Sequence, residues 1–349
     1  MPIFSANHLI DFGTKIFLAA GAPLEEAQLV SEFLVRANLA GHDSHGIIRI
    51  IQYIGDIERG IIKPGAKITI VKNSASLAIL NGNWGFGQVI AKRAMELAIE
   101  KAKDNVVGIA CAFNCNHIGR LADYTLMASR NNMIGIAMVN STKSVAPFGG
   151  RDRILSTGPI SFAFPSDTDP PIVIDIATSV VAEGKVRVML HKGERIPFGW
   201  IIDKNGNPSN NPQDLYNGGA LLPLGGDEAG HKGFGLSLAI EILSGILTGA
   251  GCAYEENKRG NGVFFEVINV EKIMPIEEFK RKISELVRTI KSSKPRPGWK
   301  EIIIPGEPEY LTEKARLKGG IYVPERTWEE IKRIANKLGV NNIPEPIAK

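Results

Sequence analysis

The alternation of short apolar runs with amphipathic runs, beginning near residue 68, most restricts how this chain can fold. Segments 68–71 and 75–80 have strand composition, and 88–103 places its apolar residues on one helical face. Such alternation packs helices against a sheet, so the sequence predicts an α/β layer structure. It also predicts strands over 106–113, 134–139 and 172–176, and helices over 121–131 and 236–247.

Both ends of the chain have helical patterns instead. Two helical runs lie between about residues 5 and 40, separated by Gly21-Ala22-Pro23. Near the other end, Thr327-Trp328-Glu329-Glu330 has the spacing of a capping box at a helix start. Residues 292–308 contain four prolines and are expected to form a connector. We therefore expect a discontinuous helical domain from residues 1–70 plus 290–349, and a layered mixed-sheet domain from 71–289.

Charge and hydropathy argue against several partners. The 349 residues are 44% hydrophobic and 22% charged, which is typical of a globular chain. The 41 basic and 37 acidic residues give a net charge of only +4, so a nucleic acid partner is not expected. No secretory signal pattern opens the chain, and no stretch approaches the roughly 18 apolar residues of a membrane span. We expect a cytoplasmic protein with no membrane partner.

Three cysteines, Cys111, Cys115 and Cys252, are too few and odd in number for a disulfide framework. Their spacing does not match a zinc knuckle. The better interpretation is small buried side chains in a reducing compartment, and no metal site is expected.

The segment Gly82-Asn83-Trp84-Gly85-Phe86-Gly87 follows a predicted strand and precedes a predicted helix, the setting of a dinucleotide-binding turn. A Rossmann turn requires G-x-G-x-x-G, and here Ile90 occupies the position of the third glycine. We therefore interpret this segment as an ordinary tight turn.

The first polar cluster that can carry chemistry is Gly41-His42-Asp43-Ser44-His45-Gly46, followed by Arg49. A helical segment would place His45 and Arg49 on one face, although Gly46 weakens that expectation. Arginine binds carboxylates through paired hydrogen bonds, and a neighbouring imidazole can exchange a proton near neutral pH. The alternative is a solvated helix terminus at which His45 only caps carbonyl groups, and spacing does not separate the two.

A second cluster, Asn114-Cys115-Asn116-His117-Ile118-Gly119-Arg120, lies between a predicted strand and a predicted helix. Ligands collect at strand ends in α/β layers, and a helix N-terminus favours anions. His117 is therefore a candidate to accept a proton. A histidine in such a turn is also often structural.

Later segments add candidate ligand contacts, each with a simpler alternative. Ser141 and Lys143 follow a predicted strand and can donate to phosphate or carboxylate oxygens, or form an exposed polar turn. Asp175 lies in an apolar strand, where it binds a ligand hydroxyl or accepts local amide bonds.

Two glycine-containing segments complete the set. Gly230-His231-Lys232-Gly233-Phe234-Gly235 introduces a predicted helix, so its amides and Lys232 can hold a phosphate, unless the glycines serve only close packing. Pro305-Gly306-Glu307-Pro308-Glu309, taken alone, indicates only a surface loop.

Together these segments resemble the malate/L-lactate dehydrogenase family, which also includes sulfolactate, ureidoglycolate and diketogulonate oxidoreductases. The likeness covers nearly the whole chain, and several ordered blocks are far more specific than any one of them. The blocks are 41–46 with Arg49, 116–119, Asn140 with 147–150, 175–179, 231–233 and 305–307.

The resemblance implies an oxidoreductase whose nicotinamide-binding fold is not of the Rossmann type. Residues 71–289 would bind NAD or NADP, and the helical domain would bind substrate and a second subunit. A homodimer or higher homo-oligomer is implied, with active sites near the subunit interface.

The resemblance also implies roles for single residues. His117 would be the leading acid/base, His45 a second candidate, and Arg49 would hold the substrate carboxylate. The residues assigned to the cofactor are Arg120, Ser141, Lys143, Asp175, Ile176, Ala177, His231, Lys232, Pro305, Gly306 and Glu307.

The expected substrate is a small 2-hydroxy or 2-oxo acid, with malate/oxaloacetate or a lactate-like pair first. The alternatives are an NAD(P)H-dependent reductase of a cyclic 2-imino acid and a non-catalytic nucleotide-binding module. The module would have no use for His45, Arg49 and His117 together, and all three are present.

Overall fold

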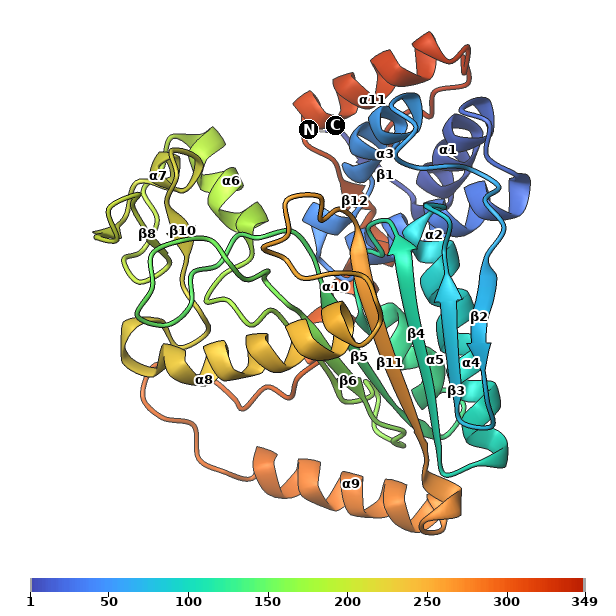
Figure 1. The fold of residues 1–349 in the computed structure, drawn as a ribbon, viewed down its shortest axis with the longest axis vertical. Coiled ribbons are helices and arrows are strands. Elements are labelled where there is room, and N and C mark those ends of the chain that lie inside the picture. Colours follow the sequence, from blue (N-terminus) through green and yellow to red (C-terminus); the bar gives the residue numbers. More distant parts are fainter. Residues whose placement is uncertain (1, 348–349) are drawn as a thin grey trace.

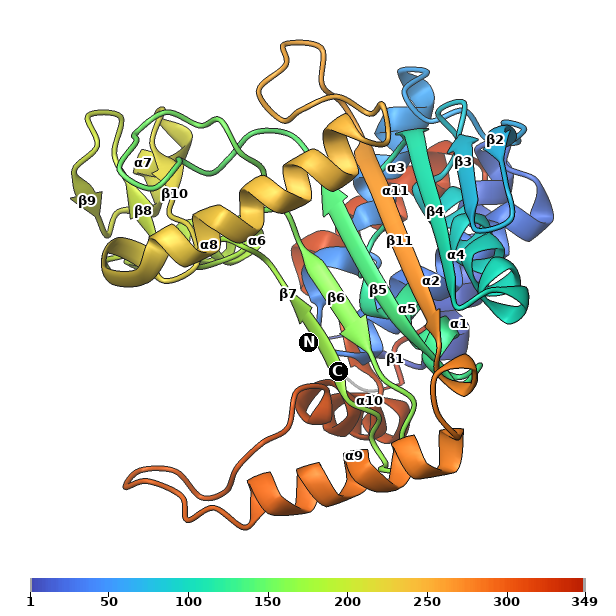
Figure 2. The same cartoon turned by 60° about the horizontal axis from the view of Figure 1, so that its bottom comes forward.

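The computed structural model describes residues 2–347, and its centre is a mixed seven-stranded sheet (Figures 1 and 2). In order across the sheet, the strands are β2 (Thr69–Asn73), β3 (Leu77–Asn81), β4 (Val107–Cys115), β11 (Asn261–Asn269), β5 (Met133–Asn140), β6 (Ile160–Ala163) and β7 (Val173–Ile176). β3 and β4 are parallel, and the other neighbouring pairs are antiparallel. The predicted α/β layer structure is confirmed.

Helices α4 (Gly87–Asp104) and α5 (Ala122–Ser129) pack against this sheet. α4 connects the parallel strands, and the alanines of its inner face, such as Ala94 and Ala98, are fully buried. A Cβ at Gly108 of β4 would lie 2.0 Å from the carbonyl oxygen of Ala98. Small residues on both elements therefore let helix and sheet approach closely.

The N-terminal and C-terminal segments meet in one helical layer (Figure 1), and the backbone amide of Ile347 donates to the carbonyl oxygen of Ile3 at 2.7 Å. β1 (Ile3–Phe4) pairs antiparallel with β12 (Ile321–Tyr322). The ring of Trp328 lies 4.2 Å from that of Phe4, between centroids, so the last helix closes over the first strand. The helices of this layer are α1 (Ala6–Ala19), α2 (Leu24–Leu39), α3 (Arg49–Glu58) and α11 (Glu325–Lys337).

A smaller lobe lies beside the main sheet. It contains a three-stranded sheet of β10 (Ala220–Leu221), β8 (Ile201–Ile202) and β9 (Pro208–Ser209), with α6 (Glu183–Lys192) and α7 (Pro212–Tyr216). From it, α8 (Gly226–Ile240) and the π-helical η2 (Glu241–Ile246) lead back to β5 and β11 (Figure 2).

The remaining helices connect the sheet to the C-terminal end. After β11 come η3 (Val270–Lys272) and α9 (Ile276–Lys291), which extends below the sheet in Figure 2. α10 (Glu307–Gly319) then packs against α2. Among the described residues, no helix combines the length and the apolar character needed to cross a bilayer.

Two predicted helix starts are wrong. α8 begins at Gly226, so the amides of residues 230–235 bond to carbonyl groups one turn earlier and are not free to hold a phosphate. Packing explains the glycines, because a Cβ at Gly233 would lie 2.4 Å from the carbonyl oxygen of Leu224. α11 begins at Glu325 after Pro324, so Thr327 lies inside the helix and caps nothing.

Candidate active site

His45, Arg49 and His117 come together near the C-terminal end of strand β4. His117 follows the end of β4 by two residues, and His45 closes the 3-10 turn η1 (Asp43–His45) just before α3. The two imidazole rings are stacked, with centroids 5.5 Å apart and planes 29° apart. The fold therefore places the two predicted acid/base candidates side by side.

Close backbone contacts hold the loop that carries His117. The side-chain Nδ2 of Asn116 donates to the carbonyl oxygens of Trp84 and Gly85, both at 2.9 Å. A Cβ at Gly87 would lie 2.2 Å from the carbonyl oxygen of His117. The glycine-rich turn at 82–87 thus serves close packing, as expected of an ordinary tight turn.

Arg49 is a half-buried cation that makes no ion pair with a described residue. Its Nε donates to the carbonyl oxygen of Ser44 at 2.7 Å, and its Nη1 donates to Oε1 of Gln52 at 2.5 Å. The carboxylate of Glu183, whose charge acts on Arg49, instead accepts from Arg187 and Tyr216, both at 2.6 Å. Part of the guanidinium remains available for an anion.

Burial and nearby cations keep both histidines neutral at pH 7. Burial, followed by the charges of Arg49, His42 and Arg120, lowers the pKa of His45 to about 3. Burial, then Arg49 and His45, lowers the pKa of His117 well below its ordinary value of 6.5. Neutral imidazoles can accept a proton, so the site has the capacity for base chemistry.

Tyr53 is a site residue that the sequence reasoning missed. Its hydroxyl lies 2.7 Å from Nδ1 of His117 and also receives a hydrogen bond from Gln88 at 2.8 Å. Burial raises the pKa of Tyr53 to about 12, so the hydroxyl stays protonated. The sequence signal that could have identified Tyr53 is its position one helical turn after Arg49 in α3.

A cavity of about 320 Å³ lies beside this cluster and collects five of the predicted cofactor residues. Arg120 is three residues beyond His117. Its Nη1 lies 3.5 Å from Oδ1 of Asp123, and its buried Nε has no hydrogen-bond partner among the described residues. Asp175 in β7 accepts from the backbone amide of Ala122 at 2.8 Å. Ile176, Pro305 and Gly306 complete this group.

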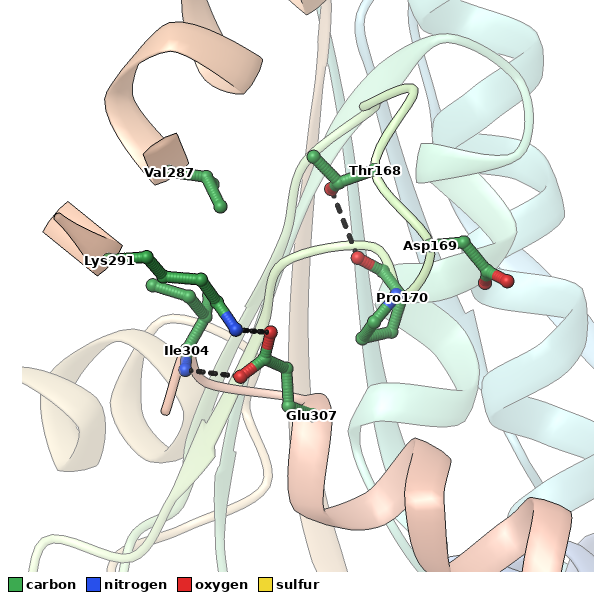
Figure 3. A pocket seen from close by; sticks show the side chains of 7 residues that line it. All are labelled: Thr168, Asp169, Pro170, Val287, Lys291, Ile304 and Glu307. Carbon is green, nitrogen blue, oxygen red and sulfur yellow. Dashed lines mark hydrogen bonds and ion pairs between the residues drawn. The ribbon is translucent and has the colours of Figure 1, made fainter. Parts of the chain in front are cut away.

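A second cavity, of about 310 Å³, contains Glu307 (Figure 3). One carboxylate oxygen of Glu307 accepts from the backbone amide of Ile304 at 2.9 Å, and the other lies 2.5 Å from Nζ of Lys291. Ile304 lines both cavities, so they are neighbours. The carboxylate of Glu307 is thus already paired within the chain.

The remaining predicted cofactor residues line neither cavity. Lys143, His231 and Lys232 are exposed, and Ser141 is half-buried. His231 packs edge-on against Phe148, with ring centroids 5.8 Å apart. Ala177 is half-buried just beyond Ile176.

The lining of the first cavity suits part of a ligand with anionic and hydroxyl groups, such as a nicotinamide dinucleotide. The positive charge of Arg120 suits a phosphate, and the Asp175 carboxylate suits a hydroxyl. Gly306 lies at the N-terminus of the 13-residue helix α10, whose partial positive charge also favours an anion.

Comparisons with known proteins identify the family. The model of the malate/L-lactate dehydrogenase family matches residues 4–332. The chain is 44% identical over 345 residues to the malate dehydrogenase of Pyrococcus horikoshii, covering 97% of this chain and 96% of that one.

Two solved structures have the same fold over nearly their whole length. The sulfolactate dehydrogenase of Methanocaldococcus jannaschii has a TM-score of 0.88 and 39% identity, over 98% of both chains. The delta1-piperideine-2-carboxylate reductase of Pseudomonas syringae has a TM-score of 0.86 and 29% identity, over 96% of this chain and 100% of that one. Because the family model, the sequence identity and the fold agree, this chain belongs to the malate/L-lactate dehydrogenase family.

Proposed function

We propose that this enzyme transfers a hydride between NAD or NADP and C2 of a small 2-hydroxy or 2-oxo acid. Malate and oxaloacetate are the first pair, and lactate-like acids follow. The observation that carries the proposal is the guanidinium of Arg49, which has no ion pair among the described residues, beside the neutral imidazoles of His45 and His117. A substrate carboxylate supplies the missing counterion.

Arg49 binds the substrate carboxylate and so fixes which face of C2 is presented for reaction. The bound carboxylate also opposes the positive charge that lowers the pKa of His117. Substrate binding therefore makes His117 a stronger base when a base is needed.

His117 moves the proton. Oxidation of a 2-hydroxy acid requires its hydroxyl proton to leave as the hydride leaves C2. Nε2 of His117 accepts that proton, since it makes no hydrogen bond to the described residues while Nδ1 faces Tyr53. His45, stacked on His117, is the second acid/base candidate.

Arg120, Asp175, Ile176, Pro305 and Gly306 hold part of the dinucleotide in the cavity beside His42. A bound nicotinamide supplies the hydride acceptor or donor. We retain as proposed contacts the residues outside that cavity, namely Ser141, Lys143, Ala177, His231, Lys232 and Glu307.

A reductase of cyclic 2-imino acids is the second candidate function. The likeness to delta1-piperideine-2-carboxylate reductase favours it. Such a substrate also carries a carboxylate next to the carbon that receives the hydride, so Arg49 and His117 would keep their roles.

We also propose a homodimer or higher homo-oligomer. Ile242, Ile246 and Leu247 are exposed by 46%, 62% and 57% along η2 and its C-terminal end, and Leu236 and Leu238 of α8 are exposed by 44% and 45%. Large apolar side chains are unfavourable in water, and a second copy of the chain would cover them.

The test is a panel of 2-oxo acids and cyclic 2-imino acids, each mixed with NADH or NADPH while the absorbance of the reduced cofactor is followed. We expect the fastest loss with oxaloacetate. Reaction with the cyclic imino acids alone would support the second candidate. No reaction with any compound would contradict both.

A further inference from the structure

A buried chain of hydrogen bonds joins His117 to side chains from two helices. The hydroxyl oxygen of Tyr53 in α3 lies 2.7 Å from Nδ1 of His117, and Nε2 of Gln88 in α4 lies 2.8 Å from the same oxygen. Tyr53 is 1% exposed and Gln88 is fully buried. The three side chains therefore set the direction of each bond without help from bulk water.

The number of hydrogen atoms restricts the directions that these hydrogen bonds can take. Gln88 donates to the hydroxyl of Tyr53, so the single O–H must find another acceptor. The carbonyl oxygen of His117, at 3.5 Å, is too far for a good bond, whereas Nδ1 is at 2.7 Å. Nδ1 then carries no proton, neutral His117 is protonated on Nε2, and Nε2 can only donate.

The same atoms also permit hydrogen bonds that run in the opposite direction. Oε1 of Gln88 is buried without a hydrogen-bond partner among the described residues. Turning the amide by half a revolution exchanges Oε1 and Nε2 with almost no change in shape. Tyr53 then donates to Oε1, and a proton on Nδ1 of His117 is donated to Tyr53. In this direction Nε2 of neutral His117 is free to accept.

Hydrogen bonding does not favour either direction. Each direction contains two bonds, and each leaves one amide atom of Gln88 unpaired. A buried chain with two equivalent directions can follow the protonation state of the group at its end.

We propose that Tyr53 and Gln88 are positioning residues that select which ring nitrogen of neutral His117 carries the proton. One direction of the chain makes Nε2 a donor, and the other makes it an acceptor. The consequence for catalysis rests on the proposed function: a 2-oxo acid needs a donor at its carbonyl oxygen, and a 2-hydroxy acid needs an acceptor for its hydroxyl proton.

The proton and the hydride balance in the oxidation. The hydroxyl proton of the substrate moves to Nε2 of His117 while the hydride leaves C2 for the oxidised nicotinamide. His117 becomes an imidazolium, and its Nδ1 proton stays bonded to Tyr53. Loss of the Nε2 proton to solvent restores the acceptor form.

The direct test is NMR of the protein labelled with ¹⁵N-histidine, which distinguishes the two neutral tautomers of a ring. The chain has six histidines, and the signals of His117 are identified by their absence in His117→Gln. Tyr53→Phe removes the hydroxyl that links Gln88 to the ring, and the lost bond is the same in both directions. Adding Gln88→Met to Tyr53→Phe should therefore leave the His117 tautomer ratio unchanged, whereas Gln88→Met alone should change it by roughly fivefold to tenfold, the effect of one buried hydrogen bond. An unchanged ratio in Gln88→Met alone would overturn the proposal.

Gln88→Met adds a test with a stated direction. It removes the amide, and Nδ1 of His117 becomes the acceptor that remains for Tyr53, so the Nε2–H tautomer should dominate. A dominant Nδ1–H tautomer would overturn the proposal. The kcat for 2-hydroxy acid oxidation should fall about tenfold with little change in KM, since Gln88 is buried behind Tyr53.

The matched control is Tyr124→Phe. Tyr124 is also fully buried, and its hydroxyl donates to the carbonyl oxygen of Ile118 rather than to a ring. This variant should leave the His117 tautomer ratio as it is in the wild type. A ratio that moves as it does in Gln88→Met would assign the effect to loss of any buried hydrogen bond near His117 and overturn the proposal.

The two proposals fail in different ways. If the wild type reduces no compound in the panel but Gln88→Met shifts the tautomer ratio, the proposed function is wrong and the proposed selection of the tautomer stands. If the wild type is active and the ratio does not move, the proposed function stands and the control of the tautomer is wrong.

Discussion

Single residues define the candidate site, and Arg49 has the widest influence among them. Its charge contributes, after burial, to the lowered pKa of both His45 and His117. The sequence identified these three residues because their types and their places near strand and helix ends suggest chemistry. The position of Tyr53 one helical turn after Arg49 was a signal, but its contact with His117, 64 residues away along the chain, could not be predicted, since only the fold creates it.

His117→Ala should lower kcat by about 10²-fold or more, the usual effect of losing a positioned acid/base, with a smaller change in KM. Steady-state kinetics with the preferred 2-oxo acid checks this. His8→Ala is the control, since His8 is exposed at the start of α1. Near-normal turnover in His117→Ala would remove His117 from the mechanism.

The lowered pKa values also predict how stability depends on pH. Below about pH 6.5 the unfolded chain binds protons at His45 and His117 that the folded chain does not, so the free energy of unfolding falls as pH falls. Each histidine should contribute at most about 2 kcal/mol between neutral pH and about pH 5. Above pH 6.5 both states are neutral, and the contribution disappears.

Urea denaturation across this range measures the effect. His117→Gln should show a weaker loss of stability at acid pH than the wild type, because one of the two histidines is gone. An identical pH dependence in the two proteins would mean that His117 titrates normally in the folded state.

At the scale of helices and strands, amphipathic spacing identified α4 and α5, and apolar composition identified β3, β4 and β5. β11 was missed: apolar side chains on both of its faces remove the alternation, and both of its partners, β4 and β5, come much earlier in the chain. The spacing of Phe279, Ile283, Leu286 and Ile290 is a signal that could have identified α9. The predicted starts of α8 and α11 were wrong, because a glycine or a proline places the boundary earlier in the chain.

Gly87→Ala tests how α4 supports the His117 loop. The new Cβ would meet the carbonyl oxygens of His117 and Asn116 at 2.2 and 2.3 Å, so the loop must move. We expect a loss of about 1–3 kcal/mol in the free energy of unfolding, together with reduced turnover.

Gly85→Ala in the same turn is the matched control. Its nearest neighbours would be at 3.4 Å, an ordinary contact distance, so the effect should be smaller. Equal losses in the two variants would mean that the turn, and not the contact with His117, is what the substitution disturbs.

For the whole molecule, the site lies where three parts of the structure meet. His45 and Arg49 come from the layer built by the chain ends, and His117 from the main sheet. The smaller lobe is adjacent, since a Cβ at Gly184 of α6 would lie 3.2 Å from the Cβ of Ser44. The sequence predicted the layers, while the domain boundaries near residues 70 and 290 stay predictions. Its periodicity carries no information about how distant segments converge.

Ile246→Glu combined with Leu247→Glu tests the proposed oligomer. Placing charges on the exposed apolar end of η2 should convert a dimer or larger assembly to monomers, because a buried charge without a partner is costly. Sedimentation analysis checks this, with Leu24→Glu on the exposed part of α2 as control. A monomeric wild type would contradict the proposed assembly.

The central claim is that Arg49 and His117 form one electrostatic unit, and an NMR titration of His117 in the free protein tests it most directly. Arg49→Gln removes a charge that lowers the pKa of His117, so the pKa should be higher in the variant than in the wild type. The same pKa in both proteins would contradict the account, because the guanidinium would then be too remote to act with His117 on one substrate.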